Sequence, residues 1–111
     1  MKRVITLIGI ITISACASVK FLDPTQEDVD RGKSKYADVT LEQLAKGKKL
    51  YQEQCGNCHK LEKLNSESEE HWKKIVPAMV KKVNKKYGNI LSAEDEDAIL
   101  KYVLIMRDAK R

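Results

Sequence analysis

Residues 55–59 read C-G-N-C-H, and what these five residues bind decides how so short a chain can fold. The chain has 111 residues, which leaves room for one small domain and its targeting segments. A domain near the lower size limit buries little core by itself and usually needs a disulfide, a metal or a bound cofactor. Two cysteines with two residues between them could provide a disulfide, half of a zinc site or a haem attachment.

The third cysteine lies at the end of a predicted export signal. Lys2 and Arg3 precede an apolar stretch over residues 4–13, and small residues follow, as in signal peptides. The run I-S-A-C at 13–16 resembles the bacterial lipobox, which implies cleavage before Cys16 and lipidation of its sulfur. We therefore expect a lipoprotein signal peptide over residues 1–15. The alternative is an uncleaved anchor, although residues 4–19 are shorter than the roughly 20 residues of a spanning helix.

Either alternative places the rest of the chain outside the cytoplasm, in the bacterial cell envelope, on the periplasmic or outer-facing side of a membrane. Residues 16–39 are polar and lack a sustained apolar period, which predicts a flexible lipid-anchored tether with a span of about 25 Å. The folded domain is then expected over residues 40–111. Loss of Lys2 and Arg3 with the signal lowers the formal net charge from +5 to +3, which is too mild to indicate nucleic-acid binding.

The pattern of the domain predicts helices only. The first begins at Thr40, where T-L-E-Q has the capping-box form, with the Thr40 hydroxyl and the Gln43 side chain satisfying free amides. It runs into C-G-N-C-H. The last helix has Ser92 as its N-cap and acids in its first turn. No stretch alternates with a two-residue period, so we expect an all-α fold.

The middle helix contains a proline. It begins near Ser66 or Ser68, both suitable N-caps, and Gly88 is a good terminator. Pro77 lacks an amide hydrogen and crowds the preceding turn, so the helix should kink or restart just before Met79.

C-x-x-C followed at once by histidine is the attachment motif of c-type haem. Each thiol, here Cys55 and Cys58, can add across a haem vinyl group, while His59 gives a nitrogen to iron. Two other chemistries remain as alternatives. A zinc site could use these three residues with His71, and a redox thiol pair would want a preceding strand and a reducing compartment. We expect one covalent haem c per chain.

Beyond the motif, residues 40–108 resemble a small class I cytochrome c. The resemblance rests on G-x-x-L-Y at 47–51, then C-x-x-C-H, then W-x-x-x-V-P-x-M at 72–79, and on L-S-x-E-x-x-x-x-I-x-x-Y at 91–102, whose last residues are Ile99 and Tyr102. It implies a small cytochrome c fold with about three main helices wrapped around one haem. It also implies that Gly47 packs closely against Tyr102 and that Met79 is the second axial ligand.

The sixth iron position has three candidates, and Met79 is the one we expect. Met106 continues an apolar helix face and is more consistent with ordinary core, and His71 is the competing nitrogen ligand. Trp72 is expected to pack against the haem or to hydrogen-bond a propionate, and Pro77 to pack against the haem.

Six lysines and no acid lie between His71 and Ala93. Such a run can be a solvated helix face, or it can steer an acidic partner to the haem side of the domain. The residues of this possible docking face are Lys73, Lys74, Lys81, Lys82, Lys85 and Lys86.

Together these features predict a membrane-tethered, single-electron carrier and not an enzyme. Its partners would be larger redox proteins or respiratory or dehydrogenase complexes, without nucleic acid or a small-molecule substrate. One alternative is a haem-based sensor or small-ligand-binding protein with an open or weakly held sixth position. Another is a haem subunit of a fixed dehydrogenase or oxidase complex.

Overall fold

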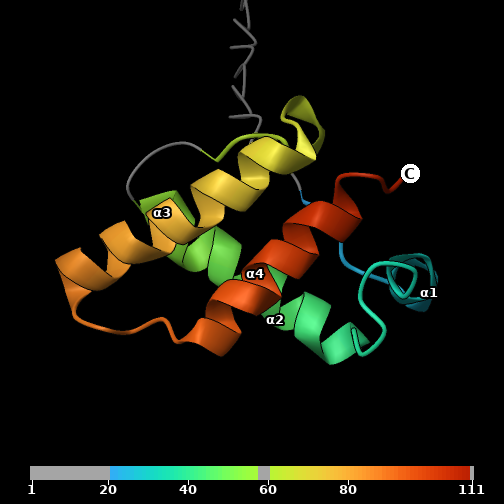
Figure 1. Ribbon diagram of the computed structural model, residues 1–111, viewed down its shortest axis with the longest axis horizontal. Coiled ribbons are helices and arrows are strands. Elements are labelled where there is room, and N and C mark those ends of the chain that lie inside the picture. Colours follow the sequence, from blue (N-terminus) through green and yellow to red (C-terminus); the bar gives the residue numbers. More distant parts are fainter. Residues whose placement is uncertain (1–20, 58–60, 111) are drawn as a thin grey trace, which may run out of the picture.

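The computed structural model describes residues 21–57 and 61–110, which form helices and loops without strands. The predicted all-α fold class is therefore confirmed for this part of the chain. In Figure 1, α4 crosses in front of α2, α3 runs along another side of α4, and α1 lies near one end of α4. The elements are α1 Gln26–Gly32, α2 Leu41–Gln54, η1 Cys55–Asn57, η2 Leu64–Ser66, α3 Glu69–Tyr87 and α4 Ala93–Met106, where η marks a 3-10 helix.

Helices α2 and α4 approach each other closely at Gly47. A Cβ atom on Gly47 would lie 2.7 Å from the Cβ of Tyr102 and would overlap the carbonyl of Ala98. Only glycine permits this approach, and Tyr102 is fully buried beside it. The predicted packing of Gly47 against Tyr102 is thus observed. Polar contacts at the start of α4 support it, because Lys46 pairs with Asp95 at 2.9 Å.

The caps explain where the helices begin. Thr40, Ser68 and Ser92 each accept a hydrogen bond from the backbone three residues later, at 3.1 Å in every case. The predicted reciprocal role of Gln43 is wrong, because its side chain instead donates to Asp97 of α4 at 3.2 Å. Tertiary contact thus competes successfully with the local cap.

The turn between α3 and α4 is closed by one side chain. Asn84 exchanges two hydrogen bonds of 2.9 Å with the backbone of Leu91. Gly88 ends α3 with a φ of 78°, in the left-handed region that favours glycine.

The predicted restart of the middle helix just before Met79 is wrong, since α3 continues through Pro77 from Glu69 to Tyr87. The alternative of a kink within the helix stays a prediction. Proline removes the amide that would bond the carbonyl of Lys73, but Lys73 and Pro77 are both exposed, so water can satisfy that carbonyl. Buried residues precede and follow the proline on the same helix, and their packing holds the two halves together. They are Trp72, Val76, Val80 and Val83.

The flexible tether predicted over residues 16–39 is also wrong for the portion described, residues 21–39. This segment contains α1, which contacts α4, and Val29 and Val39 belong to the core. Asp28 is fully buried, accepts a hydrogen bond from the Thr25 amide at 2.8 Å and pairs with Arg31 at 2.9 Å. Arg31 also donates to the carbonyl of Ile105 at 3.0 Å. The bonds of Asp28 are local, whereas the bond from Arg31 to Ile105 and the packing of α1 on α4 are long-range contacts that make α1 part of the domain.

Replacing Gly47 with alanine should destabilise the fold. The new methyl group meets backbone, and overpacking of this kind costs about 1–3 kcal/mol, which outweighs the roughly 1 kcal/mol that alanine gains in helix propensity. Urea unfolding followed by helical circular dichroism would show a lower midpoint. Gln52→Ala, at an exposed position of the same helix, is the control and should change stability by less than about 0.5 kcal/mol. An unchanged midpoint in Gly47→Ala would contradict the close contact.

Candidate functional site

A cavity of about 420 Å³ lies between the end of α2, the segment after residue 60 and one side of α3. This volume is within the range of about 300–1,000 Å³ that small-molecule and cofactor sites occupy. It is lined by Tyr51, Cys55, Glu62, His71, Trp72, Ile75, Ala78, Met79, Lys82 and Val83. Most of these side chains are apolar or aromatic, and Glu62, His71 and Lys82 are the polar exceptions.

The α2 side of the cavity follows from helical spacing. Gly47, Tyr51 and Cys55 succeed one another at intervals of four residues, so they lie on one face of α2 and its 3-10 extension. Gly47 holds this face against α4, and Tyr51 and Cys55 are buried further along it. The motif cysteine is thereby carried to the wall of the cavity.

The α3 side follows from the same period. Ile75, Met79 and Val83 are spaced by four residues and all line the cavity. Met79 reaches this position on an uninterrupted helix, so the break at Pro77 is not needed to place it. Pro77 itself is exposed and does not line the cavity, so the structure does not support its predicted packing role.

Trp72 lines the cavity and is almost completely buried. Its indole N–H donates to the carbonyl of Leu64 at 2.9 Å, and its ring meets that of Tyr51 edge to face at 6.1 Å. The indole donor is therefore committed to the backbone, which favours the packing role over hydrogen bonding to a propionate.

Tyr51 was not among the predicted site residues, although G-x-x-L-Y contains it. Its hydroxyl donates to the carbonyl of Glu62 at 3.2 Å, and burial raises the pKa of this phenol well above its usual range. It stays neutral and holds the segment that closes the cavity. The four-residue spacing between Tyr51 and Cys55 is the sequence signal that could have identified Tyr51 as a site residue. Glu62 lies in a loop, so helical spacing gives no such signal for it.

The other two candidate ligands for the sixth iron position, His71 and Met106, lie in different parts of the domain. His71 shares the cavity wall with Met79, whereas Met106 is buried in the core and is not part of the wall. Cys58 and His59 lie outside the described residues, as do Cys16 and residues 1–15. The structure therefore brings together Cys55, Trp72 and Met79 of the predicted site.

All six lysines of the possible docking face are exposed on α3. Lys82 also lines the cavity, Lys73 pairs with Glu69 at 3.1 Å, and Lys86 lies over the ring of Tyr87. The positive surface thus extends to the rim of the cavity, but some of its lysines already contact other side chains.

Within residues 21–57 and 61–110, no helix combines the length and apolar character needed to cross a membrane. Comparisons of the chain with protein-family models, with curated proteins and with solved structures found no match.

Proposed function

We propose that this protein is a membrane-tethered electron carrier that holds one haem c covalently through Cys55 and Cys58, with a small cytochrome c fold. His59 and Met79 would ligate its iron. The observation that carries the proposal is that Cys55 of C-G-N-C-H and Met79 line the same cavity. If Cys55 and Met79 were ordinary core residues, nothing would require them to line the same cavity.

The residues present fit such a group. The Cys55 thiol is buried at the wall, as a thioether to a ring edge requires, and the thioether of Met79 offers a soft ligand from another helix. Trp72, Ile75 and Val83 provide apolar surface for a flat macrocycle. Haem iron exchanges single electrons, and methionine as an axial ligand raises its potential.

Contacts among the chain's own residues hold the wall of this site in place. The Tyr51 hydroxyl donates to the carbonyl of Glu62 at 3.2 Å, and the Trp72 indole donates to that of Leu64 at 2.9 Å. These two hydrogen bonds hold the loop. Gly47 holds α2 against α4, and η1, which begins at Cys55, contacts α3. A largely apolar wall held by these contacts suits electron transfer better than binding of an exchangeable ligand, because an iron held by both His59 and Met79 would have no place for one.

The proposed anchor at Cys16 allows less movement than the sequence suggested. Phe21 packs edge to face on Tyr51 at 5.4 Å, so only five residue steps separate Cys16 from the folded domain. Fully extended, they reach at most about 18 Å. A lipid on Cys16 would therefore hold the domain within this short distance of the membrane surface.

Spectra of the membrane-extracted protein test the haem. The wild type should keep its haem bound through denaturation, because thioether bonds survive unfolding, and the double variant Cys55→Ser/Cys58→Ser should lose it. Cys16→Ser is a matched cysteine control that should keep the haem. Absence of chain-bound haem in the denatured wild type would refute the proposed cofactor.

The same preparation identifies the sixth ligand. Met79→Ala should lose the methionine-to-ferric charge-transfer band, while Met106→Leu and His71→Ala should keep it. If the Met79→Ala spectrum matches the wild type, or if the reduced wild type binds carbon monoxide without denaturant, Met79 does not hold the iron. The sensor or ligand-binding function would then replace electron transfer.

The role of the lysines can be measured with hexacyanoferrate(III), a small anionic oxidant. Oxidation of the reduced protein should slow several-fold in Lys81→Glu/Lys85→Glu at low ionic strength, and the difference should vanish near 1 M salt, where the screening length is about 3 Å. Lys49→Glu/Lys110→Glu makes the same charge change at exposed positions outside α3 and should have a smaller effect. Equal rates in both double variants would favour a merely solvated face.

Anchoring is tested by fractionation of cells. Cys16→Ser should move from the membrane fraction to the soluble fraction, because it removes the proposed site of lipidation. Cys55→Ser/Cys58→Ser should stay with the membrane as the control. Retention of Cys16→Ser in the membrane would indicate the uncleaved anchor instead.

A further inference from the structure

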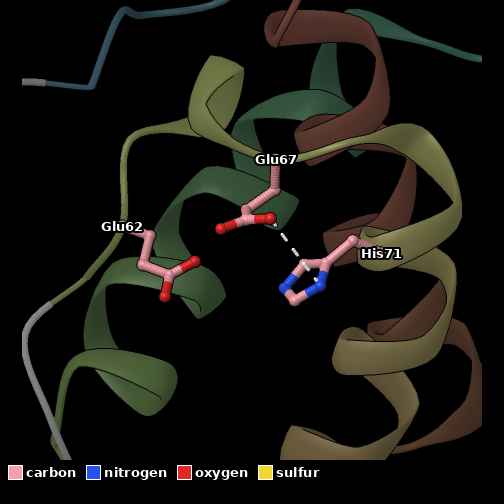
Figure 2. Close-up of side chains that lie close together, drawn as sticks. All are labelled: Glu62, Glu67 and His71. Carbon is pink, nitrogen blue, oxygen red and sulfur yellow. Dashed lines mark ion pairs between the residues drawn. The ribbon is translucent and has the colours of Figure 1, made fainter.

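Two carboxylates and an imidazole converge at the rim of the cavity. The ligand atoms of Glu62, Glu67 and His71 all lie within 4.8 Å of one another. Figure 2 shows the three side chains turned toward one space, with Glu67 and His71 joined by the ion pair. The separation of Glu67 Oε2 from His71 Nδ1 is 3.7 Å, which is longer than a hydrogen bond.

The backbone that carries these side chains is held at several points. Tyr51 donates to the carbonyl of Glu62 at 3.2 Å and Arg107 to that of Glu67 at 3.1 Å. Trp72 fixes Leu64 between them, and the His71 amide caps onto Ser68 at 3.1 Å. Four separate hydrogen bonds thus fix the segment that includes all three residues, so little backbone ordering remains for an ion to impose.

The local charge balance favours a cation. Among residues 21–57 and 61–110, neither Glu62 nor Glu67 forms an ion pair with lysine or arginine, although the chain is basic overall. Two adjacent carboxylates repel each other in this state, and a divalent cation between them would neutralise both.

The donor set selects the class of metal. Carboxylate oxygens alone would suit calcium or magnesium, whereas imidazole suits zinc, copper, iron and nickel. Zinc takes nitrogen and oxygen ligands at about 2.0–2.2 Å, so the three donors must draw together from their present spread. Glu62 is exposed, and rotation of its side chain can provide that movement. Three protein ligands leave at least one position for water.

We propose that Glu62, Glu67 and His71 form a binding site for a divalent transition-metal ion of the zinc type at the cavity rim. The site does not depend on the proposed haem, because none of its ligands belongs to C-G-N-C-H. It gives His71 a role other than ligation of haem iron.

Isothermal titration of the purified full-length protein with Zn²⁺ tests this site. We expect one binding event in the micromolar range that weakens by about tenfold or more in His71→Ala and in Glu67→Gln, since loss of even an outer-shell partner typically costs 10–100-fold. Glu62→Gln should weaken it less, because this side chain is the most exposed of the three. Glu70→Gln is the matched control: it removes the same charge from an exposed position of α3 and should change the affinity less than twofold.

Three results would overturn the proposal. One is absence of Zn²⁺ binding by the wild type at millimolar concentration. Another is binding that survives in both His71→Ala and Glu67→Gln but disappears in Cys55→Ser/Cys58→Ser, which would place the metal at the cysteines. The third is Ca²⁺ binding as tight as that of Zn²⁺ and insensitive to His71→Ala. Failure of the haem spectra would leave each of these readouts intact, so the two proposals can fail separately.

Discussion

The close approach of α2 to α4 at Gly47 is the contact on which the other parts depend. It leaves no room for a side chain between Gly47 and the backbone at Ala98, so the two helices are held at a distance set by their backbones. Tyr51 and Cys55 follow Gly47 on the same face at successive turns. Their positions at the cavity are therefore consequences of this one contact, and a shift of α2 would move both.

The opposite side of the cavity depends on α3 and on the loop that precedes it. Trp72 links the two, because its ring packs on Tyr51 while its indole N–H binds the carbonyl of Leu64. Of the two roles predicted for Trp72, haem packing or hydrogen bonding to a propionate, the committed indole N–H favours packing. The hydrogen bonds from Tyr51 and Trp72 also hold the loop that places Glu62 near His71, so the cavity and the proposed metal site share one framework.

Sequence reasoning worked best where the signal was local. The N-caps Thr40, Ser68 and Ser92, the terminator Gly88 and the all-helical class follow from side chains that act within one turn. It failed where distant residues decide the outcome. Pro77 is tolerated because α3 is packed on both sides of it, and α1 is ordered because Asp28, Arg31 and Val29 find partners or burial against the rest of the fold.

The amino-acid sequence alone establishes which chemistry the chain can offer: two thiols and a histidine in C-G-N-C-H, a methionine downstream, and an apolar helical period to bury them. These are properties of residue type and spacing, which need no fold to be recognised. That Cys55 and Met79 line one cavity, that Met106 is core, and that Glu62, Glu67 and His71 converge is visible only in the folded chain. These arrangements depend on helix packing and on a loop held by side-chain hydrogen bonds, one of them from Arg107, which lies 40 residues from Glu67 in sequence.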